Sequence, residues 1–205
     1  GVTGMATKEE DVVDKVFMAS THDYLLCFTN KGRAYWLRVY DIPEGSRTAK
    51  GKAIVNLLNL TDEDVSAVIP LRSFDSDKYF LYATKSGRIG KFSQDLFSRP
   101  RAGGIIGMTL LDGDELVDVV MTNGKSDVVL TTAYGQSLRF SEDEVRATGR
   151  GSQGVIGIKM KYEEDRVCGL TLVDEKAKYL FLLTDKGFGK RTLFDEFMGH
   201  GRATQ

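Results

Sequence analysis

Four near-copies of one unit of about 51 residues make up nearly all of this 205-residue chain. An arginine four residues before a glycine marks the copies: Arg47 and Gly51, Arg99 and Gly103, Arg150 and Gly154, with Arg202 at the same phase. A fixed period of this size is typical of a propeller, a solenoid or another array. Because each unit needs neighbours to cover its apolar faces, we expect the units to pack side by side in one domain.

Each copy carries the same order of strand-like runs. The first runs are residues 15–20, 65–70, 116–121 and 167–172, the second 24–28, 78–83, 127–130 and 178–183, the third 33–40, 88–93, 136–141 and 188–192, and the fourth 52–58, 104–110 and 155–160. The second runs are apolar at almost every position, which favours strands covered on both faces. Between the second and third runs stand Gly32, Gly87, Gly135 and Gly187. These glycines predict tight hairpins that need a positive φ.

Four antiparallel strands per unit predict an all-β, propeller-like fold of about four blades. We expect a single domain over residues 1–205, with repeats at about 14–58, 64–110, 115–160 and 166–205. Residues 2–6 resemble residues 105–109, so 1–7 is interpreted as the last strand of a preceding repeat. Either this strand closes the last blade or the chain is an excerpt of a longer array, and we favour the excerpt.

The composition offers little for an enzyme or a metal site. The two histidines, His22 and His200, lie far apart in the sequence and give neither metal-ligand spacing nor a catalytic triad. We therefore expect no catalytic residue, no metal and no cofactor in this chain. Cys27 and Cys168 stand in apolar runs and are interpreted as small core residues instead of a disulfide. With no secretory leader and no apolar run near 18 residues, we expect a cytoplasmic protein.

The order of the charges says more than their sum, which is −1 from 28 basic and 29 acidic residues. Acidic clusters recur just after the fourth run, and basic residues recur in the third run and around the marker. The basic candidates are Arg33, Arg38, Arg47, Lys50, Lys52, Arg88, Lys91, Arg99, Arg101, Arg139, Arg146, Arg150, Lys190, Arg191 and Arg202. In a radial array, this recurrence predicts a basic ring that contacts a polyanion, separate from an acidic ring. The alternative is that these charges are solvated strand edges.

Several stretches resemble the family of C-terminal domains of the DNA gyrase A protein, and the corresponding family of topoisomerase IV is a near rival. They are residues 19–28 (Ala-Ser-Thr-His-Asp-Tyr-Leu-Leu-Cys-Phe), 47–58 (Arg-Thr-Ala-Lys-Gly-Lys-Ala-Ile-Val-Asn-Leu-Leu), 111–116 (Leu-Asp-Gly-Asp-Glu-Leu) and 187–192 (Gly-Phe-Gly-Lys-Arg-Thr). The resemblance follows the whole chain in order. It departs from the family in its four units, where about six are common, and in lacking a Gln-Arg-Arg-Gly-Gly-Lys-Gly-like box.

The resemblance implies a β-pinwheel, a propeller-like disc whose neighbouring blades exchange strands. It implies that duplex DNA wraps around the basic candidates without sequence preference and so directs strand passage and negative supercoiling. It also implies that the nucleophilic tyrosine, ATP and magnesium belong to other domains or subunits of an ATP-dependent type II topoisomerase. The implied partners are double-stranded DNA, the B protein of the heterotetramer and the remainder of the A protein, in a bacterial, nucleoid-associated setting.

Two other classes of function compete with this interpretation. A propeller that binds proteins could carry an incidental basic ring, although the chain shows no tryptophan–aspartate signature of the common protein-binding propellers. An enzyme with its site in the central channel is disfavoured, because no set of titratable residues converges. The salt dependence of DNA binding separates the first rival from the DNA-binding interpretation.

Overall fold

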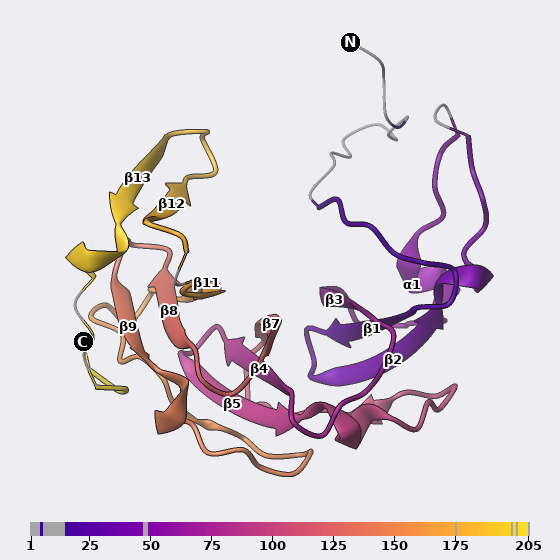
Figure 1. Ribbon diagram of the computed structural model, residues 1–205, viewed down its shortest axis with the longest axis horizontal. Coiled ribbons are helices and arrows are strands. Elements are labelled where there is room, and N and C mark those ends of the chain that lie inside the picture. The colour runs from indigo at the N-terminus through magenta and orange to yellow at the C-terminus, as the bar shows by residue number, and fades with distance from the viewer. Residues whose placement is uncertain are drawn as a thin grey trace.

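The chain is seen in a computed structural model that describes residues 5, 15–46, 49–174, 176–197, 199 and 201–204. In these residues the sheets follow one another along an open arc (Figure 1). The fold is all-β, as expected. The expected strand at 1–7 lies outside the described residues except for residue 5, and so does the candidate Arg47.

The described residues form thirteen strands. They are β1 (Tyr24–Thr29), β2 (Arg33–Arg38), β3 (Val65–Leu71), β4 (Tyr79–Thr84), β5 (Arg88–Ser93), β6 (Ile105–Ile106), β7 (Leu116–Thr122), β8 (Asp127–Thr132), β9 (Ser137–Ser141), β10 (Val155–Ile156), β11 (Val167–Leu172), β12 (Tyr179–Leu183) and β13 (Gly189–Leu193). The helices are α1 (Ile54–Leu57) and the 3-10 turns η1 (Val39–Asp41), η2 (Gln94–Phe97), η3 (Glu142–Glu144) and η4 (Phe194–Glu196).

Neighbouring repeats exchange strands. The sheet orders are β3-β1-β2-β6, β7-β4-β5-β10, β11-β8-β9 and β12-β13, and we call these sheets blades 1 to 4. A blade takes its central hairpin from one repeat and its flanking strands from the next. In Figure 1, β7 and β11 lie on the inner side of the arc, and β5, β9 and β13 lie on the outer side. Strand exchange therefore places the third run of each repeat near the outer rim.

The expected first and fourth strands need correction. Residues 15–20 form no strand, and no hairpin of a preceding repeat lies beside them in the described part of the chain. Residues 52–58 form α1 and not a strand. The other fourth runs pair for only two residues each, as β6 and β10. After β6 the chain leaves the ladder, because the amides of Gly107 and Met108 both donate to the Gly32 carbonyl.

Successive residues of the hairpin strands pack into different interfaces. In β4, Phe80 and Tyr82 belong to the core between blades 1 and 2, and Leu81 and Ala83 to the core between blades 2 and 3. This two-sided burial explains the continuous apolar runs. On blade 1 the outward face is covered by α1, since Leu58 and its neighbours pack against Leu25, Cys27 and Leu37.

The hairpin glycines have the expected conformation. Gly32, Gly87, Gly135 and Gly187 have φ of 83°, 92°, 89° and 82°. At Gly32, a Cβ would also stand 2.6 Å from the Met108 carbonyl oxygen, so the exchanged segment approaches closer than any side chain allows.

The two cysteines are free thiols, and only one is a core residue. Cys27 is fully buried, and burial raises its pKa to about 12. The prediction for Cys168 is wrong: it is exposed on β11, although its Sγ lies 3.5 Å from the Thr131 carbonyl oxygen.

Candidate nucleic-acid interface

About half of the basic candidates extend freely from the surface. Their side chains are exposed and make no hydrogen bond or ion pair within the part of the chain that the structure describes: Arg38, Lys50, Lys52, Arg99, Arg101, Arg146 and Lys190. Arg38 and Arg191 lie over the rings of Tyr24 and Tyr179, at 5.6 and 5.0 Å from the ring centroids. Such side chains are available to a polyanion, because nothing must be displaced first.

Two third-strand arginines instead bind the exchanged segment of the next repeat. Arg33, at the start of β2, donates from Nη2 to the Gly103 carbonyl at 2.7 Å. Arg88, at the start of β5, donates from Nε to the Gln153 carbonyl at 2.8 Å and from Nη2 to the Gly154 carbonyl at 2.7 Å. These carbonyls immediately precede β6 and β10.

Two marker arginines bind the other end of the same segments. Arg150 donates from Nη1 to the Ile106 carbonyl at 3.1 Å. Arg202 donates from Nη1 to the Ile156 carbonyl at 2.6 Å. Each short exchanged strand is therefore held by arginines from the repeat before it and the repeat after it. The sequence could not separate these roles, because an arginine that binds a carbonyl and one that binds a phosphate look alike.

Lys91 does not fit the predicted polyanion surface. It is only 6% exposed, its Nζ donates to the Glu142 carbonyl at 3.0 Å, and it lies 3.9 Å from the fully buried Glu142 carboxylate. Lys91 sits in the same strand position as Trp36 and Arg139, which also donate to a 3-10 turn of the next blade, at the Phe97 and Phe194 carbonyls. These three donors join blades instead of facing solvent, and Arg139 is further occupied by an ion pair with Asp127.

The acidic clusters cap the hairpin turns of the preceding repeat, a role that sequence reasoning missed. Glu63 accepts from Thr29 Oγ1, Asp114 accepts from the Ser86 amide, and Asp165 accepts from the Tyr134 amide. The recurring offset between hairpin glycine and acid was the available signal.

The expected separation of acidic and basic rings is incomplete. Glu63 accepts a hydrogen bond from the Tyr35 hydroxyl, and the same hydroxyl accepts one from Arg33 Nε. Lys85 and Glu115 form a further ion pair beside the blade 2 hairpin. Charges of both signs therefore meet at the hairpin ends of the blades.

The marker arginines of two repeats converge on one hollow. A cavity of about 400 Å³, which we call the arginine recess, is lined by Arg99 and Arg101 of the second repeat and Arg150 of the third, with Asp95 as its one carboxylate. Leu96 and Ile105 supply apolar parts of its wall. Three cations against one anion give the recess a positive potential suited to an anionic group.

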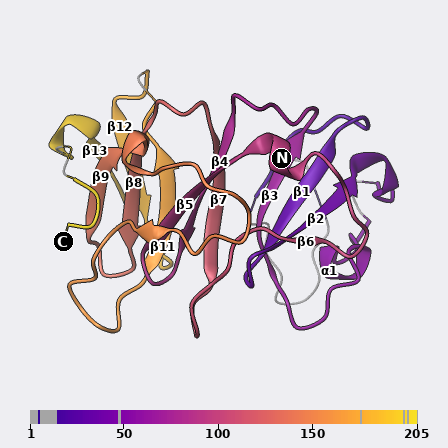
Figure 2. The same cartoon turned by 90° about the horizontal axis from the view of Figure 1, so that it is seen from below.

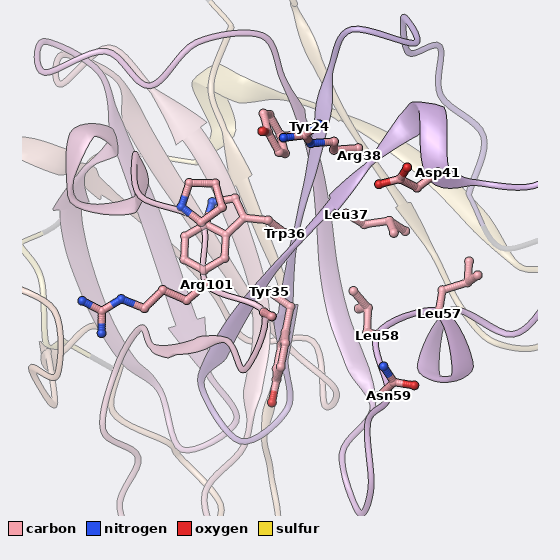
Figure 3. A pocket seen from close by; sticks show the side chains of 12 residues that line it. Tyr24, Tyr35, Trp36, Leu37, Arg38, Asp41, Leu57, Leu58, Asn59 and Arg101 are labelled. Carbon is pink, nitrogen blue, oxygen red and sulfur yellow. The ribbon is translucent and has the colours of Figure 1, made fainter.

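A second cavity of about 400 Å³ lies beside blade 1 and has another character (Figure 3). Its lining includes Tyr35, Trp36, Leu57 and Leu58. Arg101 borders this cavity too, but in Figure 3 its guanidinium points away from the leucine side chains. The apolar lining continues the cluster under α1, so we interpret this cavity as a packing gap beside the helix.

Two absences concern only the residues that the structure describes. No group of three or more His, Cys, Asp and Glu side chains there could hold a metal ion. None of the helices found there is long and apolar enough to cross a membrane.

Comparison with curated proteins gives a consistent group of relatives, all of them A subunits of DNA gyrase. The chain is 44% identical over its whole length to the protein of Salmonella typhimurium, and 43% identical to that of Buchnera aphidicola. It is 42% identical to the protein of Haloquadratum walsbyi over 98% of its length. The chain spans only about a quarter of these relatives (23%, 24% and 24%).

Two solved structures share the fold. The C-terminal domain of a DNA topoisomerase IV has a TM-score of 0.81 at 31% identity, covering 90% of this chain and 58% of that one. A DNA gyrase A C-terminal domain has a TM-score of 0.77 at 27% identity, covering 100% of this chain and 68% of that one.

The family model described as "DNA gyrase C-terminal domain, beta-propeller" matches four segments, at residues 23–72, 78–123, 126–173 and 178–205. The first three segments each begin before a hairpin and end after the inner strand contributed by the next repeat, so the matched unit follows the blades of the structure. The chain therefore belongs to the family of β-propeller C-terminal domains of DNA gyrase.

Proposed function

We propose that this chain binds duplex DNA without sequence preference and bends it around the outer edge of the arc. The observation that carries the proposal is the set of unpaired, exposed cations on the outer strands and marker segments, above all Arg99, Arg101 and Arg146. Cations of this kind contact phosphates, which position a protein on DNA without reading bases directly. A curved row of such contacts is a path for bent duplex.

In the full-length protein we propose the role of a DNA-wrapping domain in the A protein of a type II topoisomerase. Wrapping presents a neighbouring DNA segment in a preferred orientation and so gives strand passage a direction. The nucleophile, ATP and magnesium then belong to other parts of the A and B proteins, which act in the bacterial cytoplasm. The membership of the chain in the gyrase C-terminal family supports this role.

The test is a salt series of duplex binding, measured by fluorescence anisotropy. Each neutralised phosphate contributes about −0.9 to the slope of log K against log salt. The triple variant Arg99→Glu, Arg101→Glu, Arg146→Glu should weaken binding to duplexes of unrelated sequence alike and make the slope shallower. Glu163→Lys with Glu164→Lys, two exposed residues at another phase of the repeat, is the charge-matched control and should not weaken binding.

Two outcomes would overturn the proposal. One is unchanged affinity in the folded triple variant, which would favour a protein-binding propeller. The other is a loss of affinity confined to one duplex sequence, because phosphate contacts are shared by all sequences. Energy transfer between dyes at the duplex ends then measures bending, and an unbent bound duplex would exclude wrapping.

A further inference from the structure

The arginine recess joins two structural tasks that are separate elsewhere in the molecule. Arg99 and Arg101 line it with no other hydrogen-bond or ion-pair partner in the described part of the chain. Arg150 lines it while its Nη1 holds the Ile106 carbonyl at the end of β6. A guanidinium carries five N–H donors, so the contact with Ile106 leaves donors free for a second acceptor. Arg150 can therefore bind a ligand in the recess and the exchanged strand together.

The exchanged strand β6 depends on few contacts. It pairs with β2 at only two positions, Arg33 with Ile106 and Ala34 with Ile105. Ile106 is 53% exposed, so burial of its side chain adds little. The Arg33 and Arg150 contacts with Gly103 and Ile106 supplement this short ladder on either side (Figure 2). Any ligand that fixes Arg150 therefore acts directly on the attachment of blade 1 to the next repeat.

We propose that the arginine recess is a subsite for a phosphodiester of duplex DNA and that its occupation clamps β6 onto blade 1. The proposal rests on the proposed function and adds a place and a mechanical consequence to it. A phosphate oxygen suits the recess because guanidinium groups form strong, charge-assisted hydrogen bonds with phosphate. Phosphate bound at Arg150 holds the guanidinium between anion and carbonyl, so DNA binding stiffens the joint between repeats.

The chain provides matched variants that separate the two tasks. Arg99→Gln removes a recess cation that touches no exchanged strand. Arg202→Gln removes the equivalent carbonyl contact at β10, where Arg202 holds Ile156 and does not line the recess. Arg150→Gln removes both at once. Asp95→Asn removes the one carboxylate of the recess.

The experiment combines duplex binding with hydrogen exchange of the peptide spanning residues 104–108. Wild type should show slower exchange there when duplex is bound. Arg99→Gln and Arg150→Gln should each lower the salt slope by about 0.9, which makes their affinity loss from 50 to 200 mM salt roughly 3.5-fold smaller than that of wild type. Arg202→Gln should leave the slope unchanged and speed exchange only around β10. Asp95→Asn should bind duplex more tightly.

The decisive variant is Arg150→Gln at saturating duplex. It should bind DNA through the remaining cations and yet show no DNA-dependent protection of 104–108. Protection equal to wild type, or unchanged slopes in Arg99→Gln and Arg150→Gln, would overturn the subsite while leaving DNA binding in place. Failure of wild type to bind any duplex would instead overturn the proposed function. Circular dichroism confirms that each variant is folded.

Discussion

Leu81 and Phe181 occupy the same position in two hairpins of the same design, and their surroundings are opposite. Leu81 on β4 pairs in register with Lys91, and Phe181 on β12 pairs with Arg191. Leu81 is fully buried, whereas Phe181 is 65% exposed. The hairpin of blade 2 has flanking strands and a blade on each side, and the hairpin of blade 4 has two strands and one covered face. A repeat thus specifies a hairpin, while its neighbours decide what that hairpin buries.

The largest expected effect comes from breaking the buried ion pair of blade 2. Lys91→Met leaves the Glu142 carboxylate buried without its cation, which should cost about 3–5 kcal/mol of unfolding free energy. The same change at the exposed Arg191 should cost less than about 0.5 kcal/mol. Denaturant titration measures both. Adding Glu142→Gln to Lys91→Met should recover part of the loss, and a loss as large at Arg191 would contradict the comparison.

The next effect concerns the apolar pair itself. Leu81→Ala opens a cavity between blades 2 and 3 and should cost about 2–5 kcal/mol. Phe181→Ala removes a larger side chain from a mostly exposed position, and its cost should stay below about 1 kcal/mol. Thermal unfolding followed by circular dichroism distinguishes the two. Similar losses would show that the open face of blade 4 is covered in solution.

The smallest effect concerns the capped hairpin of blade 3. Burial alone would raise the Asp165 pKa, but hydrogen bonds from Thr132 and from the Arg166 and Tyr134 amides lower it below its ordinary value of 3.8. Because the folded-state pKa is depressed, this carboxylate stabilises the fold above the unfolded pKa, and that contribution is lost as the pH falls through the folded value.

Asp165→Asn should therefore flatten the loss of stability on acidification between about pH 5 and pH 3, by roughly 1 kcal/mol or less. Denaturant midpoints measured across that range test it. The hairpin of blade 4 receives no such carboxylate among the described residues, so Asp185→Asn, at its exposed turn, is the control and should leave the pH profile unchanged. An identical profile for Asp165→Asn and wild type would refute the capping role.

The sequence was sufficient for the features that recur locally. The apolar hairpin strands and the glycines at positive φ follow from residue type and spacing, so they were predicted correctly. The fourth strands were not, because their pairing depends on how far the next repeat follows β2 or β5. At residues 52–58 an apolar run became α1, since the outward face of blade 1 needed a cover and offered no strand to pair with.

The candidate interface was predictable as a region and less so by residue. The outer strands and marker segments do carry the basic side chains. What sequence could not supply were the distant acceptors of Arg88, Arg150 and Lys91, which lie on other repeats. Charge type and spacing are the same for a cation that joins blades and for one that faces solvent.

Strand exchange also sets the order in which the chain can be built. Blade 1 needs Ile105 and Ile106 to complete the ladder that begins at Arg33. During synthesis from the N-terminus, each hairpin therefore emerges from the ribosome well before the strands that flank it. Every newly made hairpin carries a temporarily open face like that of β12. The growing molecule always ends in an unfinished blade, and each further repeat completes the one before it.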